Sequence, residues 1–128
     1  MREEAHLWWE QANHDLDTAD LLLNGKRLDA ASFYYEQGVE KALKALYIAK
    51  RREAPGPTHS LTKLARDCDL PGHFLGFLRR LTGEYYISRY PDASGDLPFK
   101  AYDAAEVAET ARLSREVLTW LEQQISRF

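Results

Sequence analysis

The segment YYISRYPD, residues 85–92, places one arginine among hydroxyl-bearing side chains, two residues before a proline. A guanidinium presents its N–H donors in a rigid planar fork that matches the oxygens of a phosphate. Tyr86 and Tyr90 flank Arg89 and could stack on a base or offer a hydroxyl, while Asp92 could orient the guanidinium. The alternative is structural, because an arginine in the last turn of a helix can also satisfy the free carbonyls there.

Further candidates for such a site come from two earlier segments. QGVEKALKAL, residues 37–46, places Lys41 and Lys44 on one polar strip of a helix, with Glu40 in the favourable i,i+4 order before Lys44. We interpret the lysines as supporting cations for Arg89, although a solvated helix face gives the same pattern. His59 opens a helix at THSL and could either cap its backbone N–H groups or face a site near that helix end.

Composition and missing motifs narrow the classes of function. The chain has no phosphate-binding glycine loop, no HExxH and no CxxC, so we expect no metal and no cofactor. Seventeen Lys and Arg against twenty Asp and Glu leave a net charge of −3, which excludes a general attraction to nucleic acid. No apolar run approaches the length of about 18 residues that spans a membrane, and no signal sequence is seen. With Cys68 as its single cysteine, the protein is expected to be cytoplasmic, with no membrane association.

The elements that must position these residues are predicted to be helices. A stripe of apolar and small residues at helical spacing predicts a helix over about residues 3–24, with Gly25 as a left-handed C-cap. A second stripe predicts a helix capped by Asp29 that ends in KRRE before the APGP turn. The two stripes consist of Ala5, Trp9, Ala12, Leu16, Ala19 and Leu23, and of Ala31, Tyr35, Gly38, Ala42, Leu46 and Ala49.

The second half of the chain continues the helical pattern. Thr58 or Ser60 can cap a short helix that runs to about residue 67, and Pro71 can begin a fourth helix that ends near Arg89. After a loop over residues 91–100, Asp103 and Glu106 resemble a capping box at the start of a last helix of about 22 residues. We therefore predict one all-α domain over residues 1–128, an antiparallel up-and-down bundle of four long helices plus a short helix.

The order of these segments resembles the HEPN domain family. The likeness is carried by DLDTADLLLNG, AASFYYEQGVEKALKALYIAK, THSL and YYISRYPD, followed by the long closing helix, and covers about residues 5–124. Within the family, the chain resembles the group with S-R-Y-P-D at the end of the third segment. The resemblance implies an antiparallel helical bundle, frequent homodimers and, often, a partner that is a minimal nucleotidyltransferase.

Members of this family include RNA-cleaving toxins and catalytically silent modules that bind nucleotide or RNA. The resemblance implies that the nucleases need an arginine followed by a histidine after four to six residues, whereas no histidine follows residue 73 here. Three hypotheses therefore stand. The first is a non-catalytic module of a two-component, toxin–antitoxin-like system that engages a nucleotidyltransferase partner, a nucleotide or RNA. The others are a ribonuclease toxin with a non-standard site and a purely structural dimerisation domain, so enzymatic activity stays uncertain, with the interrupted motif against it.

The aromatic content supports a prediction of homodimers. Three tryptophans and twelve other aromatic residues are more than a thin helical bundle can easily cover, and exposed aromatic patches mark interfaces.

Overall fold

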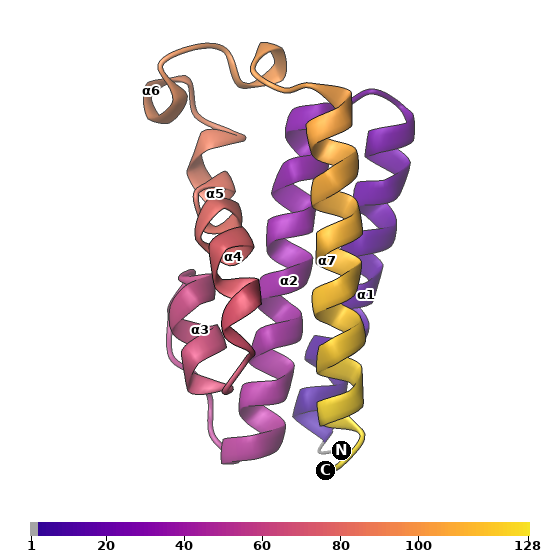
Figure 1. The fold of residues 1–128 in the computed structure, drawn as a ribbon, viewed down its shortest axis with the longest axis vertical. Coiled ribbons are helices and arrows are strands. Elements are labelled where there is room, and N and C mark those ends of the chain that lie inside the picture. The colour runs from indigo at the N-terminus through magenta and orange to yellow at the C-terminus, as the bar shows by residue number, and fades with distance from the viewer. Residues whose placement is uncertain (1–2) are drawn as a thin grey trace.

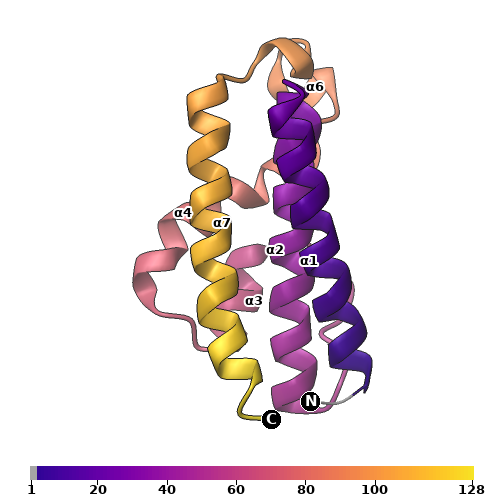
Figure 2. The same ribbon diagram turned by 90° about the vertical axis from the view of Figure 1, so that its right-hand side faces the viewer.

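The structure, a computed structural model, describes residues 3–128 apart from the side chain of Ser94. Three long helices lie along the molecule: α1 (Glu3–Asn24), α2 (Leu28–Arg51) and α7 (Ala104–Ile125) (Figure 1). Helix α2 packs against both α1 and α7, and the view turned by 90° shows the same three-helix arrangement (Figure 2). Residues 3–128 contain no β-strand, so the all-α prediction is confirmed for the described chain.

Short helices make up the chain between α2 and α7. They are α3 (Leu61–Asp67), the 3-10 turn η1 (Gly72–Phe74), α4 (Leu75–Thr82), α5 (Glu84–Ile87), α6 (Pro91–Ser94) and the 3-10 turn η2 (Pro98–Lys100). The chain runs up α1, down α2, back up through α3 to α5, and down α7 (Figure 1). This course is the expected up-and-down order, and it leaves both chain ends at one end of the bundle while α6 lies at the other.

The prediction of a continuous fourth long helix is wrong. Residues 72–87 form η1, α4 and α5 instead of one helix. Gly72 lies at the start of η1 and Gly83 lies between α4 and α5, and a glycine in a helix interior costs about 1 kcal/mol relative to alanine. The bundle thus has three long helices within residues 3–128, and a jointed segment takes the place of the fourth.

The helical stripes predicted for the long helices form the core. All six positions of the α2 stripe are buried, as are four of the six positions of the α1 stripe; Trp9 and Leu23 are half-buried. Gly38 on α2 lies directly against α1, since a Cβ added there would stand 1.9 Å from Leu16 Cδ1 and 3.1 Å from the Ala12 carbonyl oxygen. Cys68 is also buried, and burial raises the pKa of its thiol to about 12.

The predicted cap residues Ser60 and Asp103 are confirmed, whereas no described hydrogen bond from Glu106 completes the predicted capping box. The Ser60 hydroxyl accepts a hydrogen bond from the Lys63 amide at 3.2 Å, and an Asp103 carboxylate oxygen accepts one from the Ala105 amide. Both side chains replace backbone partners that the first turn of a helix lacks.

Two other caps were assigned to the wrong residue. Lys26, with φ 63°, takes the left-handed position after α1 instead of Gly25, and the Arg27 amide closes the turn on the Leu22 carbonyl at 2.8 Å. Arg27 occupies the N-cap of α2, so Asp29 is the second residue of that helix, in its first turn.

Candidate functional site

Arg89 lies just after α5 and is held by aromatic rings. Its Nε donates to the Tyr85 carbonyl oxygen at 2.8 Å. The guanidinium carbon is 4.6, 4.5 and 4.9 Å from the ring centroids of Phe33, Tyr85 and Tyr90, which places the cation in an aromatic cradle. No acidic side chain within the described residues forms an ion pair with Arg89, so its terminal N–H groups remain for an anion.

His59 reaches the same cradle from a different segment. Its ring stacks on Tyr85, with centroids 4.0 Å apart and an interplanar angle of 23°. Its Nδ1 is 3.0 Å from the Glu40 carboxylate oxygen Oε1. Tyr85 therefore contacts both His59 and Arg89, and the fold brings together the two basic groups that are thirty positions apart in the sequence.

The polar strip on α2 is buried where it meets His59. Glu40 and Lys44 are both shielded from solvent, and Lys44 Nζ donates to Glu40 Oε2 at 3.1 Å. The lysine also lies 5.4 Å from the centroid of the Trp8 ring. The i,i+4 pairing is confirmed, whereas the alternative of a solvated face is wrong for Lys44, whose charge is taken up by Glu40.

One turn earlier on α2 lies a second buried acid, Glu36. The pKa of Glu36 is raised to about 8, chiefly by burial; the hydrogen bond from Gln37 lowers this pKa and the neighbouring Glu40 carboxylate raises it. Gln37 Nε2 donates to Glu36 Oε1 at 2.8 Å, and Oε2 has no conventional partner within the described residues. A proton on Glu36 relieves the charge repulsion between two buried carboxyl groups.

Lys41 is placed toward α1 rather than toward Arg89. Its Nζ lies 2.5 Å from the buried Asp15 carboxylate, which also accepts a hydrogen bond from Gln11 at 2.9 Å. The predicted cations therefore have carboxylate partners inside the domain: Asp15 for Lys41 and Glu40 for Lys44. The prediction that they support a ligand at Arg89 stays untested.

The remaining predicted site residues lie at the end of the bundle near α6. Tyr86 and Tyr90 are exposed, and their ring centroids are 6.3 Å apart. Asp92 is exposed in the first turn of α6, and no described hydrogen bond or ion pair joins it to Arg89. The Tyr85 carbonyl and the aromatic rings orient the guanidinium, which is the role predicted for Asp92.

A surface pocket opens beside Arg89. It has a volume of about 480 Å³, within the range of about 300–1,000 Å³ that is typical of small-molecule sites. Its walls come from the start of α2, the segment after α5, and η2. The lining residues are Asp29, Ala30, Phe33, Tyr34, Ser88, Arg89, Pro98 and Phe99.

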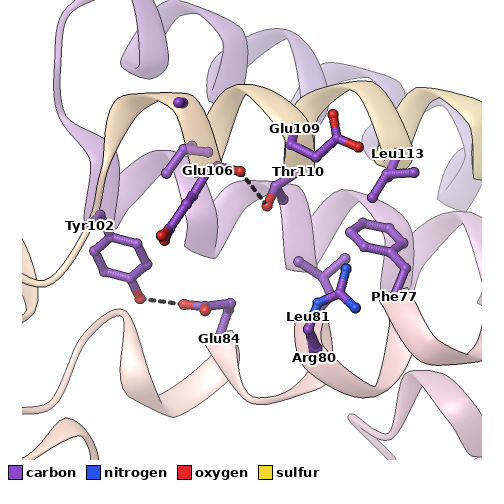
Figure 3. A pocket seen from close by; sticks show the side chains of 11 residues that line it. Phe77, Arg80, Leu81, Glu84, Tyr102, Glu106, Glu109, Thr110 and Leu113 are labelled. Carbon is purple, nitrogen blue, oxygen red and sulfur yellow. Dashed lines mark hydrogen bonds between the residues drawn. The ribbon is translucent and has the colours of Figure 1, made fainter.

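Another pocket, of about 570 Å³, lies between α4, α5 and α7 (Figure 3). Glu84 points into it and accepts a hydrogen bond from the Tyr102 hydroxyl, while burial raises the pKa of Glu84. Glu106 and Glu109 line the same pocket, with Arg80 as the basic lining residue. Three carboxyl groups against one cation disfavour a phosphate, so the pocket beside Arg89 is the better candidate for an anionic ligand.

Several site residues were missed from the sequence. Phe33 and Tyr85 contact Arg89, Glu36 and Glu40 build the buried acid pair, and Asp29 lines the pocket. Their α2 members lie at positions 29, 33, 36 and 40, which step by four, three and four along one face of that helix. The helical spacing of these four positions was therefore visible in the sequence. Because three of the residues are acidic and one is aromatic, the positions do not form an apolar stripe.

Two features bear on the class of site. The described residues hold no cluster of three or more His, Cys, Asp or Glu side chains arranged for a metal ion. Among residues 3–128, no helix combines the length and the apolar character that crossing a membrane requires.

Comparison with known proteins agrees with this architecture. The HEPN domain family matches residues 5–124, and the chain belongs to that family. The chain is similar to TT1696 from Thermus thermophilus, with 30% identity over 96% of this chain and 99% of that one, and a TM-score of 0.87. It is also similar to ST0689, an archaeal HEPN homologue, with 28% identity over 98% and 99% of the two chains and a TM-score of 0.78. No curated protein matches the chain.

Proposed function

We propose that this HEPN domain is a non-catalytic module that binds a phosphate-bearing ligand, a nucleotide or RNA, at Arg89. The observation that carries the proposal is the state of Arg89, which is fixed by the Tyr85 carbonyl and three aromatic rings but has no described acidic partner. An oriented guanidinium loses little conformational entropy when it binds a phosphate, and aromatic rings beside it can stack on a base.

The test is a binding titration with two conservative variants. Arg89→Lys keeps the charge but loses the planar fork, so the affinity for a fluorescently labelled, single-stranded RNA of mixed sequence is expected to fall by about tenfold or more. Arg79→Lys makes the same exchange at an exposed arginine of α4 and should leave the affinity unchanged. Thermal unfolding of both variants should resemble that of the native protein. Unchanged binding in Arg89→Lys, together with a lower melting temperature, would make Arg89 a structural anchor of a dimerisation domain.

RNA cleavage is a second candidate function, and one observation favours it. His59, whose Nδ1 lies 3.0 Å from Glu40 Oε1, and Arg89 both contact the Tyr85 ring, so a histidine and the arginine have a common neighbour although the sequence motif is interrupted. We still expect no cleavage of single-stranded RNA above background. Cleavage that disappears in His59→Ala but persists in His73→Ala would identify the protein as a ribonuclease and overturn the proposal of a non-catalytic binding module.

The proposal includes a protein partner. The SRYPD group that the sequence resembles supports a minimal nucleotidyltransferase as the second component of a toxin–antitoxin-like pair. Co-expression with any minimal nucleotidyltransferase whose gene is found next to that of this protein, followed by affinity purification, tests this part. We expect the two proteins to elute together, and separate elution would restrict the proposal to the ligand.

A further inference from the structure

The pocket beside Arg89 contains one acidic side chain, Asp29, among aromatic walls. Asp29 lies in the first turn of α2 and is half-buried, and no described hydrogen bond or ion pair engages its carboxylate. Its position near a helix N-terminus favours a negative charge, which is a sufficient reason for an acid there. The second observation is that Arg89 lines the same pocket without pairing with it, so a cation and an acceptor both remain free for one ligand.

Phe33 belongs to both parts of this arrangement. Its ring contacts the Arg89 guanidinium and also lines the pocket. Phe99, on η2, contributes another lining ring that is 62% exposed. The pocket thus combines a guanidinium that can bind a phosphate, flat apolar surfaces and a carboxylate that can only accept hydrogen bonds.

We infer that this pocket selects a guanine base, with Asp29 as the specificity-determining residue and Arg89 as the phosphate contact; the inference rests on the proposed function of Arg89. The Watson–Crick edge of guanine presents two neighbouring donors, N1–H and the exocyclic N2 amine, which match the two oxygens of a carboxylate. Adenine offers one donor on that edge beside the N1 acceptor, which repels a carboxylate. Uracil offers one donor between two acceptors, so guanine is the base that Asp29 accommodates best.

The experiment compares GMP, IMP and AMP by isothermal titration calorimetry on the full chain. We expect GMP to bind at least about tenfold more tightly than AMP, and IMP, which lacks the N2 amine, to fall between them. Asp29→Asn should abolish the GMP preference while AMP binding persists. Asp92→Asn is the matched control, because it removes a charge near Arg89 in the sequence but outside the pocket. It should leave the preference intact.

The outcomes separate this inference from the proposed function. Equal affinities for GMP and AMP, or a GMP preference that survives in Asp29→Asn, overturn guanine selection even if Arg89→Lys still weakens binding. Absence of binding for every nucleotide and for RNA overturns both. The order of affinities of the native protein for GMP, IMP and AMP decides whether the pocket selects guanine, even if Asp29→Asn does not fold. A single-stranded trinucleotide with one guanine then distinguishes the source: tighter binding than GMP assigns the pocket to RNA, and equal binding assigns it to the free nucleotide.

Discussion

Glu36 is a buried acid whose protonation contributes to stability. Its pKa rises from an ordinary 4.5 to about 8 because burial penalises the ionised carboxyl. Below pH 4.5 both the folded and the unfolded chain hold the proton. As the pH rises toward 8, the unfolded chain releases it while the folded chain retains it, so the contribution of Glu36 to the free energy of unfolding is lost progressively over this range.

The corresponding prediction is made for Glu36→Gln. The neutral amide keeps the size of the side chain and can donate toward Glu40, so the variant should lose less stability than the native protein between pH 5 and pH 9. From pH 5 to pH 9, the difference in free energy of unfolding between Glu36→Gln and the native protein should shift by about 2–4 kcal/mol in favour of the variant. Urea unfolding at both pH values measures it. Glu122→Gln removes an exposed acid and should show no comparable gain. Parallel pH profiles for Glu36→Gln and the native protein would contradict the assignment.

At the scale of elements, the contact between α1 and α2 depends on Gly38. The nearest groups to an added Cβ are the side chain of the fully buried Leu16 and the Ala12 carbonyl oxygen. Overpacking of this kind costs about 1–3 kcal/mol. We expect Gly38→Ala to lower the free energy of unfolding by that amount, as measured by urea titration.

Gly76→Ala provides the matched control for this substitution. A Cβ at Gly76, on α4, meets no atom within 4 Å. Alanine has a higher helix propensity than glycine, so this variant should be neutral or more stable by up to about 1 kcal/mol. Equal destabilisation by the two substitutions would show that the tight contact with α1 is not the cause.

Another element-scale prediction concerns the break between α5 and α6. Tyr90 is extended, with φ −119° and ψ 121°, as expected for a residue before proline, and Pro91 occupies the first position of α6. Proline restricts the unfolded chain here without opposing the native backbone. Pro91→Ala should therefore lower the free energy of unfolding by about 0.4–1 kcal/mol and leave ligand affinity at Arg89 unchanged. Thermal unfolding and the RNA titration measure the two effects, and a large loss of affinity would contradict this separation of roles.

At the scale of the whole molecule, we predict a homodimer. The end of the bundle formed by α5, α6 and η2 lies away from the chain termini (Figure 1). It exposes a set of large apolar side chains: Tyr86, Ile87, Tyr90, Leu97 and Phe99. Exposed apolar surface of this kind is typical of an interface. Light scattering at micromolar concentration should give twice the chain mass of 14.7 kDa.

Two charge substitutions locate the interface. Ile87→Glu, on α5, should shift the mass toward that of one chain, because burying a carboxylate in an apolar interface is unfavourable. Leu7→Glu introduces the same charge at an exposed residue of α1 and should leave the dimer intact. A mass of one chain for the native protein, or dissociation by Leu7→Glu alone, would contradict the proposed location.

Much of the helical architecture was predictable from local sequence. The stripes on α1 and α2 follow from a repeat of 3.6 residues per turn, and the Ser60 and Asp103 caps follow from the hydrogen-bonding capacity of single side chains. The jointed segment from η1 to α5 was missed, because its apolar periodicity is helical while its glycines weaken the helix. Local spacing alone does not resolve that competition.

The candidate site depends on both the local sequence and the tertiary structure. The sequence by itself determined that Arg89 ends a helical segment before an extended residue, and that Lys41, Lys44 and Glu40 lie on α2. Only the tertiary structure decided that Tyr85 joins His59 to Arg89, that Glu40 and Lys44 are buried, and that Asp29 shares a pocket with Arg89. The physical reason is the separation along the chain over which each kind of interaction acts. Periodicity and capping act within a turn or two of helix, whereas these contacts depend on how the jointed segment and η2 pack against α2.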